Sequence, residues 1–431
     1  NCFQNWANCT TLSLPHPSKY FVRENLPSGM SEFEKSSEDL STTGVDDQTP
    51  PFVTRIGAVT VSHTKPSASN PPENFEFICQ PCENPPSTQQ SASDSDNDEK
   101  EDDTYIPPVE RNITPKDVTQ INEDDDMIYI VGTQSNKVTR LHNLENMTKL
   151  KTLTCRSCLI GSMDGIVENH STMHKLELYD NHIQKLTNLD YLKNLVILDM
   201  SYNAIRDMKP VEVCVHLEEL YLAQNKLRQI QGVQNLTKLR TLDLGANRIR
   251  VISAVTSLTS LKSLWLGKNK IEEIPDLSTL QKLRQLDIQS NRLSELGSGL
   301  QNLTELEELY LACNNLHSLE GLPRCLPDEN EDKEGVSKCP QLNTIDITSN
   351  KIDNVEAVTH LHLLEEFWMS CNLIASTEAL LPLQSLPVLS CLYLEKSPIQ
   401  SNLKASYQAD VLAVLPKLTQ LDASLVSRGL S

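Results

Sequence analysis

The chain repeats one pattern of apolar and polar positions over most of its length. The pattern is LxxLxLxxNxLxxL, and its asparagine stands at residues 181, 203, 225, 247, 269 and 291, each 22 residues after the previous one. Further copies place the asparagine at residues 314, 350 and 372, and degenerate copies are centred on Asn136, Cys158 and Ser397. Six copies in strict register exceed chance, so the pattern predicts about twelve units of one structural repeat.

Each position of the pattern has a physical role. Five apolar positions are expected to point inward, and in one unit they are Leu239, Leu242, Leu244, Ile249 and Ile252. A single unit cannot bury this face alone, so neighbouring units must stack and share a continuous core. We expect each unit to form a short strand, a turn and a return segment that is helical or 3₁₀. The asparagine side chains should form a ladder that pairs backbone groups otherwise buried without partners.

These features are typical of an α/β solenoid, a leucine-rich-repeat horseshoe of about 12 repeats of the 22-residue type, with a parallel concave sheet. We place the repeat array at residues 127–397. The step from Asn314 to Asn350 is 36 residues, which indicates an insertion near residues 325–339 that loops out on the convex side. Residues 398–426 are amphipathic and are predicted to form a C-terminal cap over the last repeat.

The N-terminal part has a different composition. Residues 30–126 contain 22 Asp and Glu against 6 Lys and Arg, with many Ser and Pro, and the whole of 1–126 is predicted to be a disordered acidic region. The densest stretch, residues 91–103, holds seven acids, and Ser93 and Ser95 directly precede acids. A phosphorylated segment and a plain solvating tail both fit it. Residues 1–29 contain no Met, and one interpretation is that native translation begins at Met30.

Charge and composition limit the classes of partner. The net charge of −20 opposes binding to nucleic-acid phosphates, so no nucleic-acid partner is expected. No run approaches the roughly 18 apolar residues that span a bilayer, and the first residues do not resemble a signal peptide, so no membrane partner is expected. The 12 cysteines are scattered rather than clustered at the ends of the array, which favours free thiols in a reducing compartment.

Residues that could carry catalysis or bind metal are sparse. The pair Cys79 and Cys82 has no second pair at metal-ligand spacing. Two histidine pairs, 360/362 and 170/174, lack a third ligand nearby in sequence and are read as surface histidines. The chain has no Gly-rich phosphate loop, no GxSxG turn and no HExxH helix. We therefore expect no cofactor, no metal and no enzymatic activity.

The outward positions of the predicted strands carry the most informative side chains. Because strand residues alternate, the residue between the two strand leucines faces outward on the concave sheet. This row comprises Thr154, Glu177, Asp199, Tyr221, Asp243, Trp265, Asp287, Tyr310, Asp346, Trp368 and Tyr393, and Glu366 should flank Trp368. No structural need for these residue types is evident from the repeat. Exposed aromatics are costly unless covered and are favoured as interface anchors, so the row predicts a protein-binding face.

An alternative remains for the same row. Aromatic side chains on a sheet also pack against cross-strand neighbours, and the acids between them would then only aid solubility. Under the binding hypothesis, the alternation of acids and aromatics indicates a partner surface with Lys or Arg beside apolar or aromatic patches.

Several of these features resemble one known family. The strict 22-residue repeats, the sequence Leu-Glu-Glu-Phe-Trp-Met at 364–369 and the terminal Tyr…Leu-Pro-x-Leu segment resemble regulatory subunit 7 of protein phosphatase 1, over about residues 127–426. The resemblance implies that eight positions grip the phosphatase catalytic subunit: Asp199, Tyr221, Asp243, Trp265, Asp346, Glu366, Trp368 and Tyr393. It differs at Tyr221 and Trp265, where Phe is expected, at Asp243, where Glu is expected, and in the insertion before Asn350.

The resemblance also implies a role. It implies a non-catalytic regulator in the nucleus and cytoplasm that controls the activity or assembly of the protein phosphatase 1 catalytic subunit, and that forms ternary complexes with a further phosphatase inhibitor. The chain lacks a short [Arg/Lys]-Val-x-Phe docking peptide, so binding would come from the concave face. Two alternatives stay open: a splicing- or microtubule-associated scaffold, and an extracellular receptor, which would need a signal peptide and disulfide-bonded caps.

Overall fold

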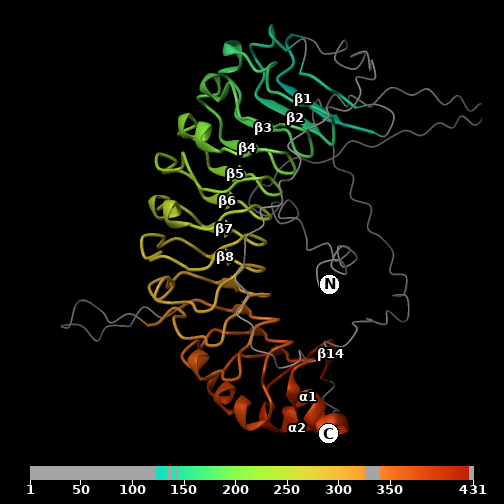
Figure 1. The fold of residues 1–431 in the computed structure, drawn as a ribbon, viewed down its shortest axis with the longest axis vertical. Coiled ribbons are helices and arrows are strands. Elements are labelled where there is room, and N and C mark those ends of the chain that lie inside the picture. Colours follow the sequence, from blue (N-terminus) through green and yellow to red (C-terminus); the bar gives the residue numbers. More distant parts are fainter. Residues whose placement is uncertain (1–122, 134–136, 142–143, 326–339, 427–431) are drawn as a thin grey trace, which may run out of the picture. The chain divides into compact units, whose positions relative to one another are not determined.

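The computed structural model describes residues 123–133, 137–141, 144–325 and 340–426, and these residues form a leucine-rich-repeat solenoid with one sheet along its inner side (Figure 1). The strands are β1 (Met127–Val131), β2 (Thr152–Arg156), β3 (Lys175–Glu177), β4 (Ile197–Asp199), β5 (Glu219–Tyr221), β6 (Thr241–Asp243), β7 (Ser263–Trp265), β8 (Gln285–Asp287), β9 (Glu308–Tyr310), β10 (Thr344–Asp346), β11 (Glu366–Trp368), β12 (Cys391–Tyr393), β13 (Gln420–Leu421) and β14 (Ser424–Leu425). They pair in chain order, parallel from β1 to β13, and only β13–β14 is antiparallel. The predicted fold class is confirmed.

The strands are short because the backbone turns sharply just before each ladder asparagine. The residue ahead of the asparagine has a positive φ in every central repeat: 56° at Tyr202, 53° at Gln224, 51° at Ala246, 57° at Lys268 and 54° at Ser290. A non-glycine residue in this left-handed conformation costs roughly 1–2 kcal/mol. The side-chain bonds of the asparagine that follows must offset this cost in each repeat.

The asparagine ladder has the predicted form. Asn247 Oδ1 accepts the backbone N–H of Leu227 at 3.0 Å, and Asn247 Nδ2 donates to the carbonyls of Leu222 at 2.9 Å and Leu244 at 3.0 Å. Leu222 and Leu227 belong to the preceding repeat, so each asparagine joins two turns of the solenoid. Equivalent bonds are made by Asn181, Asn203, Asn225, Asn269, Asn291, Asn314, Asn350 and Asn372.

The return segments lie on the opposite side from the sheet and are mostly 3₁₀ turns, as expected. They include η3 (Glu168–His170), η4 (Leu189–Tyr191), η5 (Lys209–Val213), η6 (Ser253–Ser257), η7 (Glu356–Val358) and η8 (Glu378–Ser385). The core runs between sheet and turns as one continuous cluster. The inward positions predicted from the pattern are buried; Leu242 and Ile249, for example, are 0% exposed.

The extra residues before Asn350 do not disturb the sheet. Strands β9 and β10 remain in register, with Glu308 opposite Thr344 and Tyr310 opposite Asp346. Asn350 also continues the ladder, since its Oδ1 accepts the N–H of Leu316 at 3.0 Å. Residues 326–339, where the insertion was predicted, lie outside the described residues. The acidic region before residue 123 and the degenerate repeat centre Asn136 lie outside them as well.

Cysteines provide one correction. Among the described residues Cys155, Cys158, Cys214, Cys313, Cys371 and Cys391 are free, as predicted. Cys325 is disulfide-bonded, so the prediction of a free thiol is wrong there. The sequence gives no sign of this disulfide, because the prediction of free thiols rested on whether cysteines cluster at the ends of the array.

The last repeat is covered by a compact cap. It comprises α1 (Pro398–Leu403), η9 (Lys404–Ser406), α2 (Tyr407–Val414) and the hairpin β13–β14. Val411, Leu418 and Leu421 are buried against the end of the core, as the amphipathic pattern predicted. Across the described ranges, no helix has both the length and the apolar character needed to cross a bilayer.

Candidate protein-binding face

The sheet aligns the predicted row of outward residues across the concave face. Parallel register places each member opposite the next: Glu177 with Asp199, Asp243 with Trp265, and Trp368 with Tyr393. Strands in a sheet lie about 4.8 Å apart, so acids and aromatics alternate at that spacing from Asp199 to Trp368. Thr154, Glu177 and Asp199 are buried, and the other members are half-buried by their neighbours. Glu366 lies beside the row on β11, opposite Thr344 and Cys391.

The aspartates of this row have a structural task that the sequence argument missed. Each accepts the backbone N–H two residues ahead: Asp199 from Ser201 at 2.9 Å, Asp243 from Gly245 at 2.9 Å, Asp287 from Gln289 at 2.8 Å, and Asp346 from Thr348 at 2.8 Å. An Asp side chain bonding its own backbone in this way stabilises the turn that ends the strand. The expectation that the repeat places no structural demand on these positions is therefore wrong for Asp.

Two tyrosines of the row are held by glutamates that were not predicted. Tyr221 Oη donates to Glu219 Oε2 at 2.9 Å, and Tyr310 Oη donates to Glu308 Oε2 at 2.9 Å. The repeated sequence Glu-Leu-Tyr at residues 219–221 and 308–310 could have indicated this pairing, because both residues face the same side of a strand. These bonds fix the rings and present a carboxylate beside each.

At the C-terminal end of the face the aromatics form a cluster. The Trp368 ring lies 6.5 Å from the Tyr310 ring and 6.0 Å from the Tyr393 ring, both distances between centroids. Such tilted contacts add about 0.5–1.5 kcal/mol beyond their buried area. Trp368 Nε1 is buried and has no hydrogen-bond acceptor among the described residues. The rings thus do pack against cross-strand neighbours, as the alternative interpretation holds, yet they stay half-exposed.

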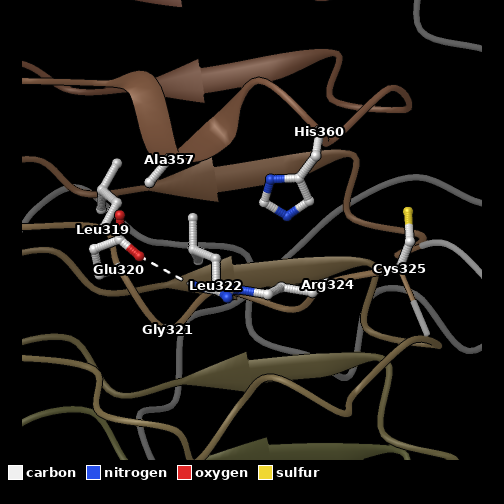
Figure 2. Close-up of a pocket in the computed structure, with 8 residues that line it drawn as sticks. All are labelled: Leu319, Glu320, Gly321, Leu322, Arg324, Cys325, Ala357 and His360. Atoms are coloured by element: carbon white, nitrogen blue, oxygen red, sulfur yellow. Dashed lines mark hydrogen bonds and ion pairs between the residues drawn. The ribbon is translucent and has the colours of Figure 1, made fainter. Parts of the chain in front are cut away.

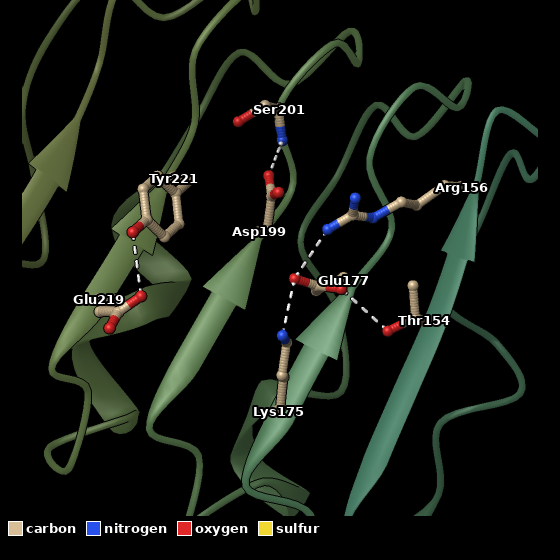
Figure 3. A network of polar contacts seen from close by, with 8 residues as sticks. All are labelled: Thr154, Arg156, Lys175, Glu177, Asp199, Ser201, Glu219 and Tyr221. Atoms are coloured by element: carbon tan, nitrogen blue, oxygen red, sulfur yellow. Dashed lines mark hydrogen bonds and ion pairs between the residues drawn. The ribbon is translucent and has the colours of Figure 1, made fainter. Parts of the chain in front are cut away.

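At the N-terminal end the row is neutralised internally (Figure 3). Glu177 accepts from Thr154 Oγ1 at 2.9 Å and forms ion pairs with Arg156 and Lys175, both at 3.0 Å. Burial of the carboxyl raises its pKa, but the Lys175 bond, the two positive charges and the Thr154 bond together outweigh burial, and the pKa lies below its usual range. This carboxylate is already paired, so it has little attraction left for a partner.

In the middle of the face the carboxyl groups have raised pKa values, in contrast to Glu177. Burial raises the pKa of Asp243 to about 7, and the charges of Asp199 and Asp287 add to the rise. Burial likewise raises the pKa of Asp287 to about 6, with a contribution from Asp346. The pKa values of Asp199 and Asp346 are raised for the same main reason. A positive charge of a partner placed here would stabilise the ionised form of these carboxyl groups.

The histidines singled out in the sequence lie away from this face. His170 is buried, so its interpretation as a surface histidine is wrong; its Nε2 is 2.7 Å from the Leu144 carbonyl and its Nδ1 accepts the Val167 N–H at 3.2 Å. His360 Nε2 is 2.7 Å from the Pro323 carbonyl, beside a cavity of about 350 Å³ (Figure 2). That cavity is also lined by Glu320, Arg324 and Cys325. Within the described residues, no group of three or more His, Cys, Asp or Glu side chains is placed to hold a metal ion.

Comparison with known proteins supports the repeat. A family model described as Leucine Rich repeats (2 copies) matches residues 215–256, 237–279 and 281–324. The human Cilia- and flagella-associated protein 410 is 31% identical over 114 residues, 26% of this chain and 44% of that protein. An Arabidopsis thaliana protein named Protein phosphatase 1 regulatory inhibitor subunit PPP1R7 homolog is 30% identical over 86 residues, 20% of this chain and 26% of the relative. The chain therefore matches less than half the length of either relative.

A solved structure shows the same architecture. An internalin (inlF) from Listeria monocytogenes superposes with a TM-score of 0.54 at 22% identity, covering 70% of this chain and 87% of the internalin. At this identity the likeness concerns the fold alone. The chain therefore carries leucine-rich repeats, which fold into a solenoid of the kind that serves as a protein-binding scaffold.

Proposed function

We propose that this protein is a non-catalytic regulatory scaffold that binds the protein phosphatase 1 catalytic subunit through its concave face and controls its activity or assembly. It would act in the nucleus and cytoplasm, in ternary complexes with a further phosphatase inhibitor. The match to the Arabidopsis thaliana phosphatase regulator homolog supports this partner. The resemblance seen in the sequence, on residues that line one face, points to the same class.

One observation carries the proposal: the unbroken alternation of acids and aromatics from Asp199 to Trp368, ending in the ring cluster around Trp368. The half-exposed rings offer apolar anchors, and the half-buried acids between them favour an approaching Lys or Arg. Anchors of this kind dominate the binding energy of protein interfaces. Partner-binding roles are therefore proposed for Asp199, Tyr221, Asp243, Trp265, Asp287, Tyr310, Asp346, Glu366, Trp368 and Tyr393. Glu177 belongs to the same row, but its pairing with Arg156 and Lys175 makes it the weakest contributor.

The face is suited to binding and not to catalysis. The carboxyls lie on an open sheet, and an open sheet does not exclude water from a reacting group. Asp243 and Asp287 have the raised pKa values that an acid catalyst needs, but each is already committed to a backbone N–H. We therefore include the absence of catalytic activity in the proposal.

The test is capture of the phosphatase catalytic subunit by the full chain. Wild type is compared with the double variant Glu366→Ala/Trp368→Ala, which removes the anchor ring and the neighbouring carboxylate. Truncating a buried anchor costs about 2–4 kcal/mol, so we expect affinity to fall by at least about thirtyfold. Purified catalytic subunit and a titration give the dissociation constants directly.

A matched control separates the face from general damage. Glu356→Ala/Leu381→Ala also replaces one acid and one large apolar residue, but on the exposed surface of η7 and η8. It should bind like wild type. Thermal unfolding must show that both variants remain folded. Undiminished affinity of a folded Glu366→Ala/Trp368→Ala protein would refute the proposed face, and wild type that captures no phosphatase would refute the partner.

A second candidate is a scaffold of another class, associated with microtubules or splicing. The similarity to the human Cilia- and flagella-associated protein 410 favours this class, since it is 31% identical over 114 residues. The same pair of variants discriminates the two. A concave face that captures tubulin or splicing proteins, and loses them in Glu366→Ala/Trp368→Ala, would support the second candidate in place of the first.

A further inference from the structure

A basic groove lies on the flank of the solenoid, away from the acid and aromatic row. It has a volume of about 560 Å³ and is lined by ten residues: Arg228, Gln229, Ile230, Gln231, Arg248, Arg250, Val251, Ser253, Ala254 and Lys270. Four of these are cations and none is an acid. In a chain of net charge −20, such a groove is a local exception that the sequence analysis did not find.

The repeat itself gathers these cations. Arg248 and Lys270 directly follow the ladder residues Asn247 and Asn269, and Arg228 and Arg250 stand three residues after theirs. Their backbone is fixed by inter-repeat bonds: the Arg248 N–H donates to the Leu227 carbonyl at 2.8 Å, and the Lys270 N–H donates to the Ile249 carbonyl at 2.9 Å. The spacing of the positive charges is therefore set by the solenoid.

One carboxylate lies at the margin of the groove. At its margin Glu272 lies 3.5 Å from Arg250 and 3.6 Å from Arg292, so one carboxylate is shared between two guanidinium groups. The lining also offers hydrogen-bonding groups from Gln229 and Ser253. Arginine forks bind carboxylates with two parallel hydrogen bonds, so the groove suits an acidic peptide.

We propose that the acidic stretch at residues 93–103 of the same chain docks into this groove. The stretch holds seven acids and one lysine, which complements the four cations. The tether is long enough: the 19 residues from 104 to 122 span up to about 65 Å, whereas the five strand spacings from β1 to β6 cover about 24 Å. A tethered segment has an effective concentration that a free competitor rarely reaches. The residues that line the groove are not among those proposed to contact the phosphatase, so docking there would leave these contacts open.

The test uses zero-length cross-linking of the full chain. A carbodiimide joins a carboxylate directly to an amine, and Lys270 is the amine in the groove. Mass spectrometry should find Lys270 joined to acids of residues 94–103. In Arg228→Glu/Arg248→Glu/Arg250→Glu, three attractions become repulsions, so the yield should fall by at least about tenfold. Lys185→Glu/Lys193→Glu/Lys282→Glu makes the same charge change at exposed sites off the groove and should keep the link.

Further measurements make each outcome decisive. If the triple arginine variant fails to fold, wild type in 1 M salt replaces it, because the Debye length shrinks from about 10 Å to 3 Å and the link should be lost. Absence of the link in wild type at low salt overturns the proposal, as does a yield that neither salt nor charge reversal lowers. In a mixture of isotopically heavy and light chains, links between chains would assign the groove to a second copy instead. These outcomes are independent of phosphatase capture.

Discussion

At the scale of single residues, each central repeat has an asparagine that bonds the backbone, and alternate repeats add an aspartate that does the same. Asn247 joins its own repeat to the preceding one through Leu227 and Leu222, and Asp243 closes the turn at the end of its strand through the Gly245 N–H. Both side chains satisfy groups that the stacked fold removes from water. The asparagine is buried in the core, whereas the aspartate faces the open sheet. The first should therefore matter for stability and the second also for binding.

We expect Asn247→Ala to lower the free energy of unfolding by about 2–4 kcal/mol, because it leaves the Leu227 N–H buried without an acceptor and leaves the Leu222 carbonyl with Asn225 as its one remaining donor. Urea unfolding followed by circular dichroism measures the loss. The matched control is Asn235→Ala, at an exposed asparagine of the adjoining return segment, which should change stability by less than about 0.5 kcal/mol. Equal losses in the two variants would contradict a structural ladder.

At the scale of elements, the strands were predictable and the side-chain contacts between them were not. Leucine spacing determines where a strand lies, because only one register buries every leucine, and all repeat strands from β2 to β12 follow it. Lys175 lies two residues before Glu177 on the same strand, so that pairing could have been predicted. The pattern could not reveal that Arg156 neutralises Glu177, because that contact depends on side-chain reach between strands. For the same reason the basic groove was missed. Its cations belong to three different repeats and only stacking brings them together.

The cap shows how one residue can close an element. Asp422 Oδ1 accepts the N–H groups of Leu394 at 2.7 Å and Glu395 at 2.9 Å, and Asp422 Oδ2 accepts from Tyr407 Oη at 2.9 Å. One carboxylate therefore ties the end of β12 to the start of α2. Asp422 Oδ1 replaces the backbone carbonyl that accepts the equivalent N–H in earlier repeats, as the Tyr393 carbonyl accepts the Met369 N–H.

We predict that Asp422→Ala lowers the free energy of unfolding by about 1–3 kcal/mol, since three donors lose their acceptor. The effect should be local. Hydrogen exchange should accelerate in the described residues after β11 and remain unchanged in the central repeats, because solenoid units contact only their neighbours. Lys417→Ala, exposed on the same cap, serves as the control. Faster exchange spread evenly along the array would argue against a cap held by Asp422.

At the scale of the whole molecule, the concave face changes character along its length. Its N-terminal end is neutralised by the ion pairs of Glu177, its middle holds acids that resist ionisation, and its C-terminal end carries the rings around Trp368. The row follows one pattern in the sequence, but its N-terminal end, its middle and its C-terminal end therefore form three chemically different surfaces. Attraction for a basic partner should be concentrated between β6 and β12, and Glu177→Gln should affect stability more than binding.

The raised pKa values in the middle of the row make the binding of a basic partner depend on pH. With pKa values of about 7 and 6, Asp243 and Asp287 are partly protonated near neutral pH. A partner Lys or Arg prefers the ionised carboxyls, so binding releases protons. Affinity should therefore rise as pH increases through the raised pKa values and level off above about pH 8. From pH 6 to pH 8 we expect the dissociation constant to fall on the order of tenfold.

The double variant Asp243→Asn/Asp287→Asn isolates this effect from groups that titrate on the partner. It keeps the side-chain oxygen that accepts the Gly245 and Gln289 N–H groups, but it has no proton to release. Its affinity should be lower than that of wild type at pH 8 and should change with pH less steeply, through Asp199, Asp346 and the partner's own groups. Calorimetry in buffers of different ionisation enthalpy counts the protons released in each case. A variant with the same pH slope and the same proton count as wild type would show that the middle of the row lies outside the interface. The anchors around Trp368 would then have to account for binding alone.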